Sequence, residues 1–149
     1  AAAEREQAPQ PQASGEARPG SGRHVVYVDD NAAMVLLVTR MLEEEGYRVS
    51  GYEGASQALE ALREDAGTVD LVVTDYNMPG MSGLELAHEV ERLRPGLPVV
   101  VASGFVTEEL KAYAAAVGVR QVIHKPDTFE ELGRAVGALA AAAPERNAP

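Results

Sequence analysis

Hydrophobic and polar residues follow two different spacings along most of this chain. Short apolar runs of strand length occur at residues 24–28, 47–52, 70–75, 97–103 and 119–125. Segments with apolar residues at helical spacing follow these runs at 31–46, 55–66, 82–94, 107–118 and 127–143. Strand and helix therefore alternate five times. This order predicts an α/β domain in which a parallel sheet is covered by helices on both faces.

Local signals mark several helix ends. Ser82 and Glu85 have the spacing of a capping box, and Thr107 is expected to be the N-cap of the next helix. Gly46 is expected to act as a C-cap and Gly118 as a helix stop, because glycine readily adopts the left-handed conformation found there.

The two ends of the chain have a different composition from the middle. Residues 1–22 are mainly Ala, Pro, Gln and Gly, and they contain almost no large apolar side chain. Such segments cannot bury enough surface to offset the entropy lost on ordering. We therefore expect a disordered linker over 1–22, one domain over 23–143 and a disordered tail over 144–149.

Composition narrows the classes of function. The formal net charge of -10 makes nucleic acid an unsuitable direct partner, since phosphate binding needs a basic surface. The absence of cysteine excludes disulfides and Cys-based metal sites, and it fits a reducing compartment. No apolar run approaches the roughly 18 residues that span a bilayer, and no signal peptide is visible. We expect a cytoplasmic location, with no membrane contact in this segment.

Polar side chains with distinct chemistry follow four of the five predicted strands. Asp29 and Asp30 follow the first strand, Asp75 ends the third, Ser103 ends the fourth and Lys125 ends the fifth. The carboxyl ends of parallel strands meet at one edge of the sheet, where α/β proteins bind ligands. The pattern therefore predicts three carboxylates, a hydroxyl and an ammonium group in one site.

This set of groups suits a divalent cation and a phosphoryl group. Clustered carboxylates without His or Cys favour Mg²⁺ or Mn²⁺ over Zn²⁺. Mg²⁺ and Lys125 together balance three ionised acids, and the acids should keep the pKa of Lys125 from being lowered. A phosphoryl group adds about 1.5 to 2 negative charges. The metal, the lysine and the hydroxyl can each meet a different phosphoryl oxygen, as phosphoryl transfer requires.

Four motifs in this order resemble the receiver domain of bacterial two-component response regulators. They are V-D-D-N (28–31), T-D-Y-N-M-P-G-M-S-G (74–83), V-A-S-G (101–104) and K-P (125–126). The resemblance covers most of the chain outside its two ends. It implies a flavodoxin-like three-layer sandwich, with a five-stranded parallel sheet in the strand order 2-1-3-4-5.

The resemblance also implies roles for individual residues. Asp75 matches the phosphoacceptor, which takes a phosphoryl group from a histidine of a kinase or phosphotransfer domain. Asp30, Asp75 and the backbone carbonyl of Asn77 match the Mg²⁺ ligands, and Asp29 matches a second acid that reaches the metal through water. Lys125 matches the lysine that pairs with a phosphoryl oxygen.

The resemblance further implies a switch. Ser103 matches the hydroxyl that moves onto the phosphoryl group, and a cis bond between Lys125 and Pro126 would aim the lysine at the site. The family often carries an aromatic residue three positions before the lysine, where this chain has Val122. Phe105, just past the serine, is a candidate substitute.

Other functions fit the residues less well. A hydrolase of the haloacid dehalogenase type needs two acids on alternate residues after the first strand, whereas Asp29 and Asp30 are adjacent. A receiver-like binding scaffold would be signalled by loss of Asp75, Asp30 or Lys125, and all three are present. A flavin-binding protein would need a Ser/Thr phosphate loop after the first strand.

The three histidines share no motif. His88 precedes a glutamate, as a kinase phosphohistidine does, but that site needs a helical domain that the α/β alternation excludes. We expect His88 to be a solvated surface residue and the His124 side chain to point away from that of Lys125, its neighbour on the strand, while His24 has no assigned role.

The wider context is an interpretation of the same resemblance. The N-terminal leader and the Ser-Gly-Phe run at 103–105 are typical of receivers at the C-terminus of hybrid histidine kinases. We expect the receiver to catalyse its own phosphorylation and slow dephosphorylation, with kinase activity only as part of such a kinase. We also expect an output partner that the sequence does not identify, and a monomer or weak homodimer.

Overall fold

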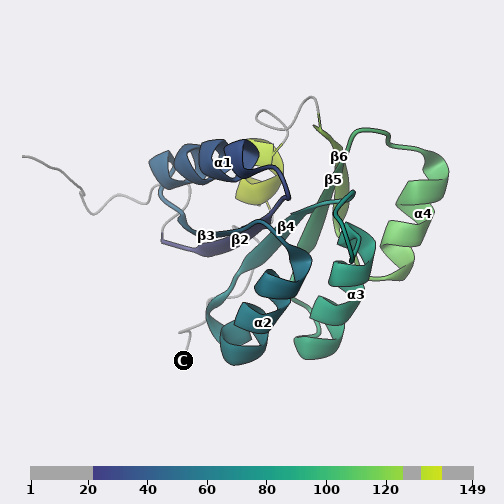
Figure 1. Cartoon of the computed structure of the whole chain (residues 1–149), viewed down its shortest axis with the longest axis horizontal. Helices are drawn as coiled ribbons and strands as arrows, with labels where there is room; N and C mark the ends of the chain where they lie inside the picture. The colour runs from purple at the N-terminus through teal and green to yellow at the C-terminus, as the bar shows by residue number, and fades with distance from the viewer. Residues whose placement is uncertain (1–21, 126–131, 139–149) are drawn as a thin grey trace, which may run out of the picture.

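The computed structural model describes residues 22–125 and 132–138 (Figure 1). The strands are β2 (His24–Val28), β3 (Arg48–Tyr52), β4 (Leu71–Asp75), β5 (Val99–Ser103) and β6 (Gln121–His124). The helices are α1 (Ala32–Glu44), α2 (Ala55–Asp65), the 3-10 helix η2 (Ala66–Thr68), α3 (Gly83–Leu93) and α4 (Glu108–Ala116). Residues 132–138 are also helical.

The five strands form one parallel sheet. Their order across the sheet is β3-β2-β4-β5-β6, so the first strand in the chain lies between the second and the third. This is the predicted order 2-1-3-4-5, and the flavodoxin-like fold is confirmed. Val28 pairs with Thr74, so β2 and β4 end at the same level of the sheet. The residues that follow these two positions therefore meet at the sheet edge.

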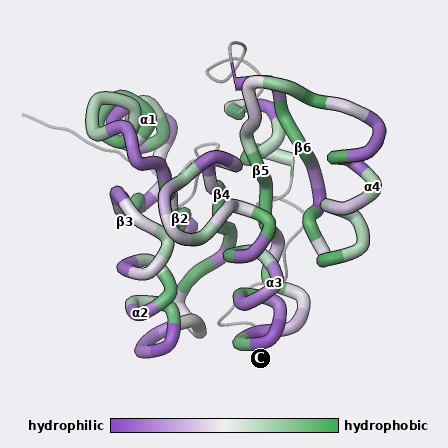
Figure 2. The backbone as a smooth tube through the Cα atoms, turned by 45° about the vertical axis from the view of Figure 1, so that its right-hand side comes forward, coloured by the Kyte–Doolittle hydropathy of each residue, from purple (hydrophilic) through white to green (hydrophobic). Residues whose placement is uncertain are grey.

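The hydrophobic core has two layers, one on each face of the sheet. Successive strand residues point to opposite faces, so Val25 and Tyr27 pack with α1 while Val26 and Val28 pack with α2 and α3. Figure 1 shows α1 and the helical residues 132–138 on one face and α2 and α3 on the other. In Figure 2, hydrophilic and hydrophobic residues alternate repeatedly along α2 and α3, as expected for helices with one buried side.

The predicted helix starts are confirmed. Ser82 and Glu85 form a reciprocal capping box, and the Thr107 side chain accepts a hydrogen bond from the Leu110 N–H. The prediction that Gly46 is the C-cap of the first helix is wrong by one residue, because the C-cap of α1 is Glu45. Gly46 is the next residue, with a φ of 98°. Glycine adopts such a φ without strain, so Gly46 allows the chain to leave the helix immediately after the C-cap.

Several predictions lie outside the described residues. They are the linker over 1–22 apart from Gly22, the tail over 144–149, the Lys125–Pro126 bond, and both ends of the helix predicted over 127–143. Within 22–125 and 132–138, no helix has the length and apolar character needed to cross a bilayer.

Candidate functional site

Three carboxylates gather where β2 and β4 end. Asp29 and Asp30 follow β2, and Asp75 is the last residue of β4. Ligand atoms of the three side chains lie within 4.8 Å of one another. Asp29 and Asp75 are buried, with 0% and 4% of their surface exposed, whereas Asp30 is exposed. The three acids therefore form one cluster that is open to solvent on the side of Asp30.

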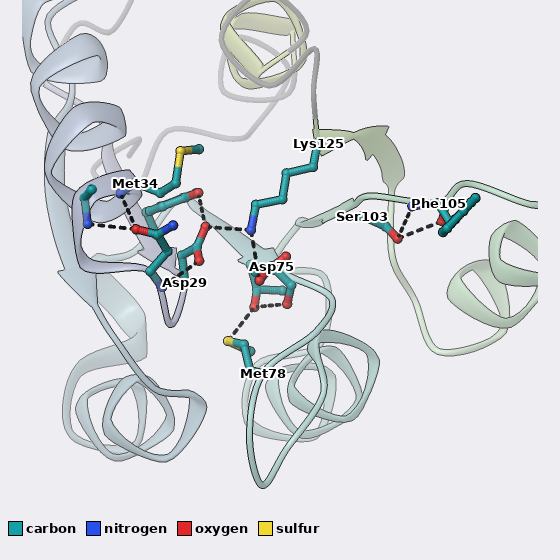
Figure 3. A network of polar contacts seen from close by, with 11 residues as sticks. Asp29, Met34, Asp75, Met78, Ser103, Phe105 and Lys125 are labelled. Carbon is teal, nitrogen blue, oxygen red and sulfur yellow. Dashed lines mark hydrogen bonds and ion pairs between the residues drawn. The ribbon is translucent and has the colours of Figure 1, made fainter.

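Lys125 extends from the end of β6 into this cluster. Its Nζ lies 3.3 Å from Oδ2 of Asp29 and 3.1 Å from Oδ2 of Asp75. Figure 3 shows the lysine side chain directed between the two acids. The pKa of Lys125 is raised: burial alone would lower it, but the hydrogen bond to Asp75 and the charges of both acids outweigh the burial. The prediction that its pKa is not lowered is confirmed.

Burial and neighbouring charges act together on the Asp75 carboxylate. The pKa of Asp75 is raised, chiefly because burial disfavours the charged carboxylate. The hydrogen bond from Lys125 lowers this pKa, while the nearby charges of Asp29 and Asp30 raise it further. The contact with Lys125 therefore does not outweigh burial and the neighbouring acid charges at Asp75. A set of carboxylate oxygens with unbalanced negative charge fits a hard divalent cation.

The Asp29 carboxylate is fixed by hydrogen bonds as well as by Lys125. The Tyr27 hydroxyl donates to Oδ2 at 2.8 Å, and the Asn31 N–H donates to Oδ1 at 2.9 Å. Asn31 is also the N-cap of α1. Tyr27 was not expected to have a functional role. Its position two residues before Asp29, on the same side of the strand, is the signal that could have identified it.

The turn after Asp75 is held against the start of α3. The Gly83 N–H donates to the Tyr76 carbonyl at 2.9 Å. A Cβ at Gly83 would lie 2.5 Å from the backbone oxygen of Asp75, so a glycine is needed for this close approach. Asn77 lies within the turn, two residues after Asp75.

Ser103 lies at the same sheet edge, but its side chain is directed elsewhere. Its hydroxyl donates to the Phe105 carbonyl at 2.7 Å and accepts from the Phe105 N–H at 3.2 Å. Figure 3 shows the hydroxyl on the side away from Lys125. Ala102 is the residue paired with Asp75, so the next residue along β5 faces the opposite side of the sheet. The structure thus brings together the acids and the lysine, with the serine turned away.

A hollow of about 360 Å³ lies beside Ser103. It is lined by residues that include Tyr76, Asn77, Leu110 and Tyr113. Phe105 also lines this hollow, and 84% of its surface is exposed.

Val122 occupies a different environment from Phe105. It is half-buried and packs against the core layer under α2 and α3. The two residues therefore differ in packing, because Val122 contacts the core layer while Phe105 is exposed on a loop.

The histidines lie outside the acid cluster. His88 is exposed on α3, as expected. His24 and His124 are half-buried. Nε2 of His24 lies 2.8 Å from Oγ of Ser50, and Nε2 of His124 lies 3.2 Å from the Gly104 carbonyl oxygen.

Comparisons with known proteins agree with this geometry. Residues 25–137 match the family model of the response regulator receiver domain. The chain is 34% identical over 103 residues to the putative two-component response regulator ARR21 of Arabidopsis thaliana, covering 69% of this chain and 16% of that protein. It is 34% identical over 117 residues to the sensor protein GacS of Pseudomonas syringae, covering 75% of this chain and 13% of that protein.

Solved structures give the same assignment. A CheY-like response regulator receiver domain protein from Methanospirillum hungatei superposes with a TM-score of 0.74 at 27% identity, covering 81% of this chain and 95% of that one. The chain spans only a small part of the curated relatives, whose full lengths include much more than the matched region. The fold, the sheet-edge acids and the family match place this chain in the receiver domain family of two-component phosphorelay systems.

Proposed function

We propose that this receiver takes a phosphoryl group onto Asp75 from a phosphohistidine of a histidine kinase or phosphotransfer domain. The observation that carries the proposal is the Lys125 ammonium group, which lies 3.3 Å from Asp29 and 3.1 Å from Asp75. Asp30 completes a group of three acids beside it. This arrangement combines a nucleophile with a fixed positive charge at an edge open to an incoming group.

The residues fit Mg²⁺ or Mn²⁺. Asp29, Asp30 and Asp75 offer carboxylate oxygens within 4.8 Å of one another, and the backbone carbonyl of Asn77 would be a further ligand. When bound, the cation supplies positive charge that offsets the acids and the phosphoryl oxygens.

The transfer itself uses Asp75 and Lys125. An Asp75 carboxylate oxygen forms a bond to phosphorus as the bond from phosphorus to the histidine nitrogen breaks. The electron pair of that bond stays on the imidazole, which leaves as the neutral ring once protonated. Lys125 is placed to donate a hydrogen bond to a phosphoryl oxygen, which stabilises the added negative charge.

The proposed switch involves Ser103. To reach a phosphoryl group on Asp75, its hydroxyl has to give up both hydrogen bonds to the Phe105 backbone. The loop that carries Phe105 would then be free to rearrange around the hollow beside it. Phosphorylation would thereby change the surface that an output partner meets.

Phosphorylation by a small-molecule donor tests the proposal. With Mg²⁺ and acetyl phosphate, the intact mass of the parent protein should increase by one phosphoryl group, and removal of Mg²⁺ with a chelator should abolish the increase. The Asp75→Asn variant should show no increase because an amide is not a nucleophile for this step. An unchanged mass gain in the variant would identify another acceptor and contradict the assignment.

The context of the domain is a second part of the proposal. Relatives at about one-third identity include the sensor protein GacS and the sensory/regulatory protein RpfC, in which the matched region is a small part of the length. We infer a receiver domain over residues 23–143 that belongs to a hybrid histidine kinase. The reading frame upstream tests this: a kinase core there would support it, and a frame that begins just before residue 1 would contradict it.

A further inference from the structure

Tyr27 is a core residue with a polar contact at its far end. It is the next-to-last residue of β2, and none of its surface is exposed. Its ring belongs to the core layer that α1 covers. Its hydroxyl donates a hydrogen bond to Oδ2 of Asp29 at 2.8 Å. A phenylalanine would fill the same volume in the core, so the hydroxyl is the part that needs an explanation.

The strand geometry accounts for the contact. Tyr27 and Asp29 are two residues apart on β2, so their side chains leave the strand on the same face. The tyrosine ring runs through the apolar layer and carries its oxygen to the acid at the strand tip. Burying a hydroxyl without a partner costs free energy, and the Asp29 carboxylate satisfies it.

Three groups fix the Asp29 carboxylate. Tyr27 and Lys125 both contact Oδ2, and the Asn31 N–H donates to Oδ1. A carboxylate has about four lone-pair positions, so these contacts leave little freedom of rotation. Lys125 is shared with Asp75 and is the group proposed to meet the phosphoryl oxygens. Tyr27 can therefore keep its contact with Oδ2 while Lys125 changes partner.

We propose that Tyr27 is a positioning residue for the acid cluster: its buried hydroxyl holds the Asp29 carboxylate in the orientation that supports divalent cation binding. This inference rests on the proposed function, because it assumes that the cluster binds Mg²⁺ or Mn²⁺. Groups that hydrogen-bond to the acids around a metal orient them and contribute strongly to metal affinity.

A second tyrosine provides a matched control. Tyr47 is also buried, with 3% of its surface exposed, and it belongs to the same core layer. Within the described part of the chain, its hydroxyl has no hydrogen-bond partner. Tyr27→Phe and Tyr47→Phe thus remove the same atom from the same layer, but only the first removes a contact with Asp29.

Mn²⁺ affinity is the direct test, measured on the whole chain by electron paramagnetic resonance of the free ion. Tyr27→Phe should bind Mn²⁺ about tenfold more weakly than the parent. Tyr47→Phe should bind it as the parent does. Equal affinity in the parent and in folded Tyr27→Phe would overturn the inference, as would an equal loss in both variants. A parent protein that binds no Mn²⁺ would instead overturn the proposed function.

A measurement on the parent protein needs no variant. If Tyr27 donates to a carboxylate that takes part in cation binding, the Cζ resonance of its ring should shift as Mg²⁺ is added, along the same titration curve as the Asn31 amide. The Tyr47 resonance should not follow this curve. A Tyr27 resonance that stays fixed while the Asn31 amide moves would overturn the inference even if Tyr27→Phe failed to fold.

Discussion

Two regions on the same sheet edge are built differently. The first is the site where β2 and β4 end, and the second is the loop between β5 and α4. At the first, Asp29 is fully buried and is held by Tyr27 and Asn31, each two residues away in the chain, and by Lys125, which follows the distant strand β6. In the second, Ser103 bonds to the backbone of Phe105, two residues further on. The first region thus has long-range ion pairs to Lys125 in addition to local hydrogen bonds, whereas the hydrogen bonds of the Ser103 side chain are local.

This difference matches two different tasks. Groups that stabilise charge work best when they are already in place, because no reorganisation is then needed during the reaction. A conformational response requires contacts that differ between two states. The acids and Lys125 meet the first requirement. The Ser103 contacts meet the second, because a local pair of hydrogen bonds costs only about 0.5–1.5 kcal/mol each to exchange.

The largest expected effect is the loss of the switch in Lys125→Ala. The variant should fold and bind Mg²⁺, but the phosphoryl-bound state loses a charge-assisted contact worth about 1.5–3 kcal/mol. Beryllofluoride, a phosphoryl mimic, should therefore produce much smaller amide NMR shifts around Ser103 and α4 than in the parent.

Lys111 is the matched control for this prediction. It is the only other lysine in the chain, and it pairs with Glu108 at 3.5 Å on the exposed side of α4. Lys111→Ala should respond to beryllofluoride as the parent does. Full shifts in Lys125→Ala would show that this lysine is not part of the switch.

A pair of glycine substitutions compares the rigidity of the two regions. In Gly83→Ala the new Cβ would lie 2.5 Å from the Asp75 backbone oxygen, so backbone has to move. We expect a loss of roughly 1–3 kcal/mol in the free energy of unfolding, as in other overpacked sites. Gly104→Ala places its Cβ in open space and should change stability by less than about 0.5 kcal/mol.

Urea denaturation of both variants measures this difference. Phosphorylation kinetics should also slow in Gly83→Ala, because the displaced backbone carries the acceptor. Equal stability of the two variants would mean that the turn after Asp75 is as adaptable as the loop after Ser103, which would remove the contrast between the two regions.

The metal-free protein should be stabilised by Asp75→Asn at neutral pH. The folded-state pKa of Asp75 is raised from its ordinary value of 3.8, mainly by burial. The unfolded state therefore loses this proton at a lower pH than the folded state does, and stability falls as pH rises from the unfolded pKa through the folded one. The uncharged amide removes this loss.

Thermal unfolding in a chelator at several pH values checks this prediction. The stability difference between Asp75→Asn and the parent should increase from low pH to neutral pH and should shrink when Mg²⁺ is added. A parent that is more stable than the variant at pH 7 without metal would show that the contact with Lys125 outweighs the cost of burial.

Among the substitutions of polar site residues, the smallest expected effect on stability is that of Ser103→Ala. The two lost hydrogen bonds connect to the backbone of Phe105, an exposed loop residue, where water can replace the serine hydroxyl. We expect a loss of at most about 1 kcal/mol, together with faster amide hydrogen exchange at Phe105. The Asp29 and Asp75 amides should exchange as in the parent. Slowed exchange at Phe105, or a loss comparable to that of Gly83→Ala, would contradict a purely local role.

Much of the fold could be predicted from the sequence for a simple physical reason. Alternating strand and helix patterns allow few arrangements other than a parallel sheet between two helical layers, and capping residues such as Ser82 and Thr107 act within one turn of the chain. The same reasoning predicted that Asp29, Asp75 and Lys125 lie at one edge of the sheet, because the carboxyl ends of parallel strands are on the same side. These features depend on local sequence and on strand direction.

Tertiary structure decided what local patterns do not encode. The β2–β4 register sets Asp29 beside Asp75, and the reach of Lys125 across the sheet edge sets its contacts with both acids. The side-chain directions of Tyr27 and Ser103 depend on which sheet face each occupies and on the neighbours there. The sequence alone determined which chemical groups are present and on which strands they lie. Packing across the sheet determined which of them touch, because contacts between distant residues depend on register and burial.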